Sequence, residues 1–237
     1  MQLFYQPGIP EGVHHLDPDE SRHAAKVLRL KEGDPLSVTD GKGVLYEVQI
    51  LRADFTKCTF RILNADIQPQ HKFHRHIAIA PTKNADRTEW FVEKAIELGI
   101  DQISFILCKN SERKVLNAER MEKIAVSAMK QSLQSCLPIL TPLHPFRDIL
   151  KSSVNQKFIA CVDPENPQHL KSLAQPGNNY LVLIGPEGDF APDELQQALD
   201  NGFQKVSLGS TRLRTETAGL AACHILNLIN SSSSGKI

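Results

Sequence analysis

The sequence predicts an α/β domain preceded by a small β-rich domain. Up to about residue 68, apolar and polar residues alternate in short stretches, which is typical of half-buried strands. From residue 77 onward, apolar strands alternate with amphipathic helical segments, the pattern of a mostly parallel sheet with helices on both faces. A chain of 237 residues, 41% of them hydrophobic, is long enough for one or two such domains.

The first domain is expected to span residues 1–70. One helix interrupts its strands: it begins at Pro18 and carries an apolar stripe that includes Ala24 and Leu28. Gly41-Lys-Gly43 lies between two strands and predicts a hairpin turn. The expected strands are residues 36–40, 44–51 and 58–63.

The second domain is expected to span residues 74–230, with a frayed tail at 231–237. The polar stretch 68–76 is the best linker in the chain, since no helix or strand period appears before Ile77. The expected strands are residues 77–80, 103–107, 158–162, 181–184 and 206–208. The expected helices are residues 85–98, 117–136, 168–174, 192–200 and 216–230.

Composition excludes several classes of protein. The 27 Lys and Arg balance the 27 Asp and Glu, which argues against a polybasic nucleic-acid binder. The longest apolar run, residues 180–184, is far too short to span a bilayer. The first residues lack the basic start and apolar core of a signal peptide, so a cytoplasmic location is expected.

Neither the cysteines nor the histidines form a metal-binding pattern. The five cysteines are dispersed and contain no Cys-x-x-Cys pair, so we expect buried thiols in a reducing compartment. His71, His74 and His76 lie close together, but in a linker with Lys72 and Arg75 they indicate an RNA-facing or simply solvated segment rather than a metal site. No metal is expected.

The neutral total conceals a basic middle segment. Residues 71–150 carry 12 Lys and Arg against 9 Asp and Glu. A solvated face and a patch that contacts phosphates explain this excess equally well. Five of the basic residues crowd around one strand-to-helix connection: Lys109, Arg113, Lys114, Arg120 and Lys123.

No standard nucleotide-binding fingerprint is present, which counts against a Rossmann-type or P-loop enzyme. Instead, Gly185-Pro-Glu-Gly188 follows a strand that is expected to be buried. Its glycines let the backbone approach a ligand closely, and open α/β sheets bind ligands at the carboxyl ends of strands. A plain connecting turn is the alternative, because Gly-Pro-x-Gly is common in turns.

A second unusual stretch, residues 208–218, also lies between a strand and a helix. Arg212 and Arg214 beside a helix start could hold a carboxylate or a phosphate. Thr215 or Thr217 can cap the helix. Glu216 suits the positive end of the helix dipole, which is the alternative to a chemical role.

These two loops together resemble the ribosomal RNA small subunit methyltransferase E family of the SPOUT superfamily. The pattern is Ile184-Gly-Pro-Glu-Gly followed by Leu208-Gly-x-x-Arg-Leu-Arg-Thr-Glu-Thr-Ala218. Further pieces match along the whole chain: a Phe-Tyr start, His23-x-x-x-Val-Leu-Arg29, Arg87-x-Glu-x-x-x-Glu-Lys-Ala-x-Glu-Leu-Gly99 and Ser111-Glu-Arg113. Five short matches in the right order make the resemblance specific.

The resemblance implies a fold and an activity. It implies a PUA-like β-barrel that helps to bind RNA, followed by a SPOUT-type α/β domain with a C-terminal trefoil knot. It also implies a homodimer that binds S-adenosylmethionine and methylates N3 of one uridine in 16S rRNA, either in free rRNA or in the assembled small ribosomal subunit.

Site residues are carried over by the same matches. The implied cofactor-binding residues are Leu183, Ile184, Gly185, Pro186, Glu187, Gly188, Leu208, Gly209, Leu213, Arg214, Thr215, Thr217 and Ala218. A third cofactor loop is expected near residues 162–165. Arg214 is expected to stabilise the negative charge on the uridine, and Glu216 is a candidate proton acceptor. The expected RNA contacts are Arg29, Lys83, Arg87, Arg113, Gln131 and Arg212.

The chain departs from the family pattern at two places. Asp189 stands where a second glycine is common, and Asp tolerates a left-handed turn better than most residues. Lys130 and Gln134 replace two polar residues of the family, while Gln131 remains as a substrate contact or a hydrogen-bonded interface residue. These changes would permit an alternative function, an inactive module that only binds RNA.

Overall fold

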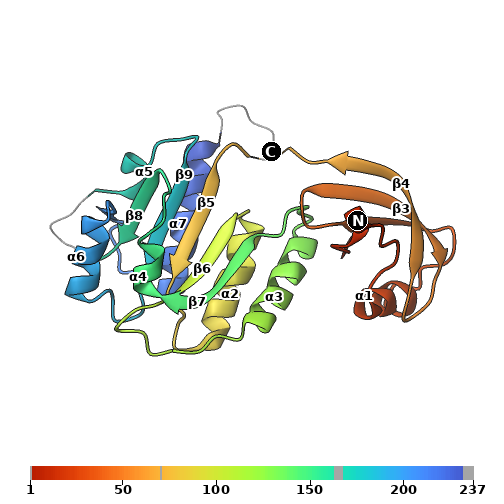
Figure 1. Ribbon diagram of the computed structural model, residues 1–237, viewed down its shortest axis with the longest axis horizontal. Coiled ribbons are helices and arrows are strands. Elements are labelled where there is room, and N and C mark those ends of the chain that lie inside the picture. The colour runs from red at the N-terminus through yellow and green to blue at the C-terminus, as the bar shows by residue number, and fades with distance from the viewer. Residues whose placement is uncertain (1, 70, 163–167, 232–237) are drawn as a thin grey trace. The chain divides into compact units, whose positions relative to one another are not determined.

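The computed structural model describes residues 2–69, 71–162 and 168–231, which form two compact units (Figure 1). The first unit comprises residues 1–70 and 126–137, and the second comprises residues 71–125 and 138–237. The expected tail lies outside the described residues from position 232 onward, as do residues 163–165 of the expected third cofactor loop.

The first unit is built on a four-stranded sheet in the order β1-β2-β3-β4, in which β1 and β4 are the edge strands. β1 pairs with β2 in parallel, and the remaining pairs are antiparallel. The sequence missed β1, which is only three residues long. The strands are β1 (Leu3–Tyr5), β2 (Pro35–Thr39), β3 (Val44–Arg52) and β4 (Thr59–Ile67).

Alternation along β3 explains how this sheet covers its core. Tyr46, Val48 and Ile50 point inward and are buried, while Glu47 is exposed. The predicted hairpin turn between β2 and β3 is confirmed, because the Asp40 carboxylate accepts hydrogen bonds from the N–H groups of Lys42 and Val44. The same core takes in Phe4 and Phe60.

The helix expected from Pro18 is two short helical pieces, α1 (Pro18–Arg22) and the wider π-helix η2 (His23–Val27); a 3-10 turn, η1 (Ile9–Glu11), precedes them. The Asp17 side chain caps α1 by accepting the Glu20 N–H at 2.8 Å. In η2 the Leu28 N–H reaches back five residues to the His23 carbonyl, which widens the turn. Arg29 then leaves the helix with a left-handed φ of 56°.

Residues 126–137 belong to the first unit, although the sequence assigned them to the second domain. The Ser135 carbonyl accepts hydrogen bonds from Thr39 Oγ1 at 2.9 Å and from the Gly43 N–H at 3.0 Å. The Leu137 N–H donates to the Gly41 carbonyl. These bonds join two segments about ninety residues apart in the sequence, so no local pattern could predict them.

The second unit is a six-stranded sheet in the order β10-β8-β9-β5-β6-β7, and all its pairs are parallel. Its strands are β5 (His74–Ile79), β6 (Gln102–Leu107), β7 (Ile139–Pro145), β8 (Gln156–Ala160), β9 (Asn179–Ile184) and β10 (Gln204–Val206). Its helices are α2 (Ala85–Glu97), α3 (Ala118–Gln131), α4 (Phe146–Ile149), α5 (Leu170–Leu173), α6 (Pro192–Asp200) and α7 (Thr215–Asn230), with the end of α3 in the first unit.

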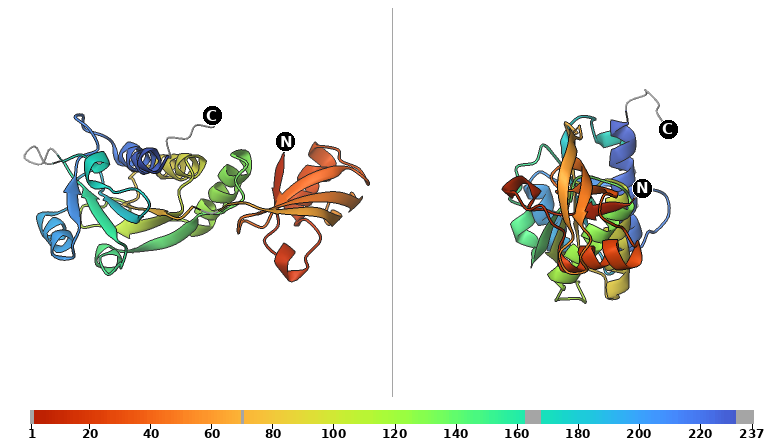
Figure 2. Two further views of the ribbon diagram at one scale, coloured as in Figure 1. Left: turned by 90° about the horizontal axis from the view of Figure 1, so that it is seen from above. Right: turned by 90° about the vertical axis from the view of Figure 1, so that its right-hand side faces the viewer.

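Helices cover both faces of this sheet, as the sequence predicted. In Figure 2, α2 and α7 (yellow and dark blue) lie on one face, while α4 and α6 lie on the other. The alternation of β9 matches this arrangement, because Leu181 and Leu183 pack into the cluster that holds Phe146 of α4 and Ala198 of α6. The trefoil knot implied by the resemblance stays a prediction.

The second unit differs from expectation at three points. The linker ends earlier, since β5 begins at His74, and Arg75 and His76 are buried with hydrogen-bond partners on other segments. β7 and α4 were not predicted, because three prolines and a histidine interrupt any regular pattern there. α3 ends at Gln131, and Leu133 has a left-handed φ of 56°.

The cysteines are free thiols, of which Cys58, Cys108 and Cys223 are buried while Cys136 is exposed. Among the described residues, no group of three or more His, Cys, Asp or Glu side chains could hold a metal ion. Within the same residues, no helix has the length and apolar character needed to cross a bilayer.

Candidate active site

Three loops meet at the carboxyl ends of the adjacent strands β8, β9 and β10 and surround a cavity of about 880 Å³. They contribute residues 160–162, residues 184–189 except Gly188, and residues 206–215, and Ala218 of α7 completes the lining. The carboxyl edge of a parallel sheet is where open α/β folds bind ligands. This cavity is therefore the candidate active site.

The loop after β9 is held rigidly by its own turn and by α7. The Asp189 N–H donates to the Pro186 carbonyl at 2.9 Å, and Asp189 has a left-handed φ of 62°. Thr215 Oγ1, at the start of α7, donates to the Gly185 carbonyl at 3.1 Å. The predicted turn and the predicted helix start are thus directly connected.

Two neighbouring loops brace the loop after β9 from outside the cavity. Glu187 Oε1 accepts the Lys83 N–H at 2.9 Å, and the Asn110 side-chain amide donates to the carbonyls of Gly188 and Asp189. Arg113 in turn donates to the carbonyls of Thr82 (3.0 Å) and Lys83 (2.6 Å). The loops that precede α2 and α3 are therefore tied to the cavity wall.

The loop after β10 supplies the free positive charge of the cavity. Gly209 adopts a φ of 147°, and no atom lies within 4 Å of where a Cβ would stand, so its backbone faces open space. Arg212 and Arg214 are exposed and line the cavity, and neither forms an ion pair with a described residue. Two unpaired guanidiniums at a cavity are suited to an anionic ligand.

Comparison with known proteins agrees with this geometry. A family model described as "RNA methyltransferase domain" matches residues 69–227, and one described as "RNA methyltransferase PUA domain" matches residues 16–63. The Ribosomal RNA small subunit methyltransferase E of Buchnera aphidicola subsp. Acyrthosiphon pisum is 30% identical over 234 residues, covering 93% of this chain and 90% of that protein. The chain belongs to the ribosomal RNA small subunit methyltransferase E family.

Solved structures of similar proteins share the fold over the full length. A protein described as "probable rRNA-methyltransferase" from Porphyromonas gingivalis is 40% identical with a TM-score of 0.91, covering 98% of this chain and 99% of that one. Ribosomal RNA small subunit methyltransferase E from Neisseria gonorrhoeae, solved with S-adenosyl methionine bound, is 28% identical with a TM-score of 0.83 and covers 97% and 98% of the two chains. The PUA and SPOUT domains expected from the sequence are thus present.

Most of the cofactor-binding residues expected from the family motifs lie together around the cavity. Those that line it are Ile184, Gly185, Pro186, Glu187, Leu208, Gly209, Leu213, Arg214, Thr215 and Ala218. Leu183 does not line it because its side chain is fully buried in the core, and neither Gly188 nor Thr217 reaches it.

Sequence reasoning missed several lining residues, which carry no motif of their own. They are Ala160, Cys161, Val206, Ser207, Ser210 and Thr211. Their signal was positional: each ends or follows β8 or β10, at the edge where a parallel sheet collects its loops. Val162, the one described residue of the expected third cofactor loop, also lines the cavity.

Glu216, the candidate proton acceptor, does not line the cavity. Its side chain is 9% exposed, and Oε1 lies 3.8 Å from Nε of Arg87 on α2. Oε2 is buried without a hydrogen-bond partner among the described residues. Of the two residues next to Glu216 in α7, Thr215 lines the cavity and Thr217 is exposed.

The residues expected to contact RNA fall into three groups. Arg212 lines the cavity and is free, whereas Lys83 is exposed in an ion pair with Glu112 at 2.7 Å. Arg87 and Arg113 are engaged within the protein, as described above.

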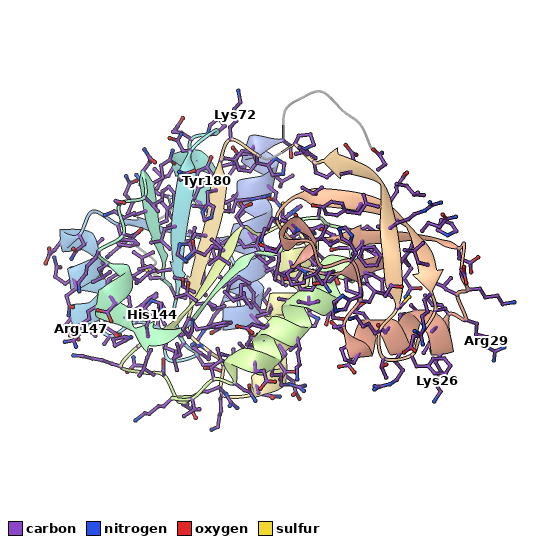
Figure 3. All side chains as sticks on the ribbon, turned by 45° about the vertical axis from the view of Figure 1, so that its right-hand side comes forward. Lys26, Arg29, Lys72, His144, Arg147 and Tyr180 are labelled. Carbon is purple, nitrogen blue, oxygen red and sulfur yellow. The ribbon has the colours of Figure 1, made fainter. Side chains whose placement is uncertain are left out.

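Arg29 and Gln131 belong to the first unit, where both are exposed. Figure 3 shows the Arg29 and Lys26 side chains directed away from the sheet of that unit.

Lys130, one of the two departures from the family pattern, has a structural partner. Its Nζ donates to Glu20 Oε1 on α1 and lies 5.8 Å from the centre of the Phe4 ring. Burial raises the pKa of Glu20, which the ion pair with Lys130 opposes. Gln134 donates to Ser132 Oγ at 3.1 Å. Both residues thus serve the packing of the first unit.

Proposed function

We propose that this protein is an S-adenosylmethionine-dependent methyltransferase that methylates N3 of a uridine in 16S rRNA. The observation that carries the proposal is the cavity at the carboxyl ends of β8, β9 and β10, which gathers the residues of both family motifs beside two unpaired arginines. Support also comes from family membership and from the relative solved with S-adenosyl methionine.

The cavity fits a cofactor of this size and chemistry. Ligand pockets usually enclose about 300–1,000 Å³, and this one is about 880 Å³. Apolar side chains such as Ile184, Leu208 and Leu213 can pack against an adenine ring. At Gly209 a ligand can approach the backbone directly, because the space that a side chain would fill is open.

Methyl transfer here needs charge stabilisation more than covalent help from the protein. Bound S-adenosylmethionine supplies an electrophilic methyl group on a sulfonium. N3 of uridine carries a proton that must leave, so negative charge develops on the ring as N3 becomes nucleophilic. In our proposal the free guanidinium of Arg214 stabilises that charge and orients the base.

Substrate RNA is held in this proposal by residues that are exposed on the surface. Arg212, beside Arg214, is suited to a phosphate near the target nucleotide. Lys83, Arg29 and Gln131 are exposed and can make further contacts. Arg113 acts indirectly in this proposal, since it fixes the backbone of Thr82 and Lys83.

Glu216 and Arg87 have a positioning role in this proposal. Their ion pair links α2 to the first turn of α7, and Arg214 precedes that turn directly. The pair therefore helps to set where the Arg214 guanidinium lies. The uridine N3 proton leaves to solvent rather than to Glu216, which does not reach the cavity.

The biological setting follows from the substrate. We propose that the protein works as a homodimer in the cytoplasm on 16S rRNA, free or within the small ribosomal subunit. An inactive RNA-binding module is the less favoured function, because Lys130 and Gln134 have structural partners and the cavity retains its two free arginines.

Methylation by the purified protein tests the proposal. Small subunits and free 16S rRNA from a strain that lacks the gene are incubated with methyl-labelled cofactor, and the nucleosides are separated by mass spectrometry. We expect one 3-methyluridine per rRNA molecule. Label in a different nucleoside, or no label with either substrate, would refute the proposed activity.

A further inference from the structure

Among the described residues, three that are not glycine have a positive φ. Of these three, only Asp189 lines the cavity. Its φ of 62° is strained for most residues, but Asp and Asn adopt this conformation comparatively easily. The conformation is needed because the Asp189 N–H closes the turn onto the Pro186 carbonyl at 2.9 Å. A glycine would meet the same backbone requirement, so the side chain must be explained separately.

The Asp189 carboxylate reaches across to the loop after β8. Oδ1 accepts the Phe190 N–H at 2.8 Å, and Oδ2 lies 3.4 Å from the N–H of Val162, another lining residue. The side chain thus stands at the cavity wall between the loops that follow β8 and β9. A carboxylate at this place adds a negative charge beside Ala160, Cys161 and Val162, a part of the wall that has no other charged side chain.

The other charges at the cavity are placed differently. Arg212 and Arg214 come from the loop after β10, and Glu187 is exposed with Oε1 bound to the Lys83 N–H. Asp189 is only partly exposed, so water screens its charge less than that of Glu187.

We infer that Asp189 is a specificity-determining residue, which makes the cavity favour the cationic sulfonium form of the cofactor over its neutral thioether product. The inference rests on the proposed function. In the reaction the methyl carbon bonds to uridine N3, the carbon–sulfur bond breaks, and sulfur keeps the electron pair and becomes neutral. A nearby carboxylate attracts the sulfonium and has no such attraction for the thioether.

The expected size of this preference follows from Coulomb's law. The attraction between two opposite unit charges about 8 Å apart, at an effective dielectric constant of about 40 for a partly hydrated site, lowers the Kd of the cationic ligand about fivefold. Asp189 therefore also helps fresh cofactor to displace the product after transfer.

Calorimetric titration with S-adenosylmethionine and S-adenosylhomocysteine tests this inference without any turnover. The quantity compared is the Kd for S-adenosylhomocysteine divided by the Kd for S-adenosylmethionine. Asp189→Asn removes the charge but keeps the left-handed turn and an oxygen acceptor, and Asp189→Gly keeps only the turn. Asp193→Asn is the matched control, since Asp193 is an exposed carboxylate paired with Lys109 and does not line the cavity.

We expect the ratio to fall about fivefold in both Asp189 variants and to stay unchanged in Asp193→Asn. A wild-type ratio in Asp189→Asn would overturn the inference and leave Asp189 as a tie between two loops. Should Asp189→Asn fail to fold, Asp189→Gly gives the same comparison. Absence of binding of either compound to the wild-type protein would instead refute the proposed function.

Discussion

At the scale of single residues, Arg214 carries most of the proposed chemistry. It directly precedes α7, lines the cavity and has no ion-pair partner among the described residues. The sequence already places Arg214 beside the start of a helix, because the motif lies between an expected strand and an expected helix. The sequence could not show that Glu216, two residues later, turns its side chain toward Arg87 and not toward the cavity.

Arg214→Ala should lower the methylation rate at least a hundredfold, because a preorganised cation at a developing anion contributes on that order. Binding of the cofactor should survive, within about threefold in Kd, since backbone groups and apolar side chains form most of the cavity wall. Single-turnover rates and calorimetry measure the two quantities. An Arg214→Ala variant with wild-type turnover would remove Arg214 from the mechanism.

His76 makes the stability of the second unit depend on pH. Burial is the main cause that lowers the pKa of His76 to about 3, and the nearby His74 and His144 add to it. Its ring accepts or donates one hydrogen bond, to Ser104 Oγ at 2.7 Å. In the unfolded chain His76 has an ordinary pKa of 6.5 and binds a proton that the folded state excludes.

The free energy of unfolding should therefore fall as the pH drops below 6.5. From pH 7 to pH 5 the loss attributable to His76 is about 2 kcal/mol. Urea unfolding of the wild type and of His76→Gln at both pH values measures it, and the variant should lose about 2 kcal/mol less than the wild type. Equal losses in the two proteins would contradict the assignment.

At the scale of elements, the packing of α7 on α2 sets the position of the loop that carries both arginines. At Gly219 there is no room for a side chain: a Cβ there would stand 2.5 Å from Phe91 Cε2 on α2 and 3.1 Å from Ile79 Cδ1 on β5. Gly219 is buried within a helix, where alanine would ordinarily be preferred. Close packing, and not backbone conformation, therefore requires the glycine.

Gly219→Ala should destabilise the protein by about 1–2 kcal/mol, because the cost of overpacking exceeds the gain in helix propensity. It should also slow methylation through a displaced Arg214, with little change in the Kd of the cofactor. The double variant Gly219→Ala with Phe91→Leu is the control, since the smaller side chain makes room for the Cβ. A more stable Gly219→Ala protein would show that the helices can separate at no cost.

Most elements could be predicted from the sequence, and the exceptions have physical causes. The helix at 192–200 is confirmed to the residue, because apolar periodicity and an N-terminal proline mark it. The start of β5 was hidden because Arg75 is buried: Asp101 pairs with it at 2.8 Å and Asn227 accepts another of its hydrogen bonds. In a sequence, a buried arginine cannot be told from an exposed one, and the two partners of Arg75 lie 26 and 152 residues away.

The same reasoning explains which parts of the candidate site were predictable. The two motif loops were found because glycine, proline and arginine stand out in a sequence. The six lining residues without a motif, such as Cys161 and Ser207, became visible only when three strands were adjacent. The order of strands in a sheet depends on contacts between distant segments, which composition and periodicity do not encode.

At the scale of the whole molecule, a neutral chain is expected to bind RNA through a few local charges. The 27 basic and 27 acidic residues cancel, and several arginines are bound to other groups of the protein, among them Arg75, Arg113 and Arg120. The free cations at the cavity are Arg212 and Arg214. Bulk phosphate neutralisation therefore contributes little.

The affinity for rRNA should depend only modestly on salt. A plot of log Kd against log salt concentration should have a slope of about 2–4, which corresponds to roughly three or four neutralised phosphates. Filter binding between 50 and 300 mM salt measures the slope, and Arg212→Ala should lower it by about one. A slope near 10, as for a polybasic binder, would contradict this distribution of charge.

The modification state of rRNA in a deletion strain tests the central claim most directly. A methyl group on N3 of uridine blocks base pairing, so reverse transcriptase stops one nucleotide before it. Primer extension along the whole 16S rRNA should show one stop in the wild type that is lost in the deletion strain, restored by the wild-type gene and not restored by Arg214→Ala. An unchanged pattern of stops in the deletion strain would refute the proposal that this protein methylates 16S rRNA at uridine N3.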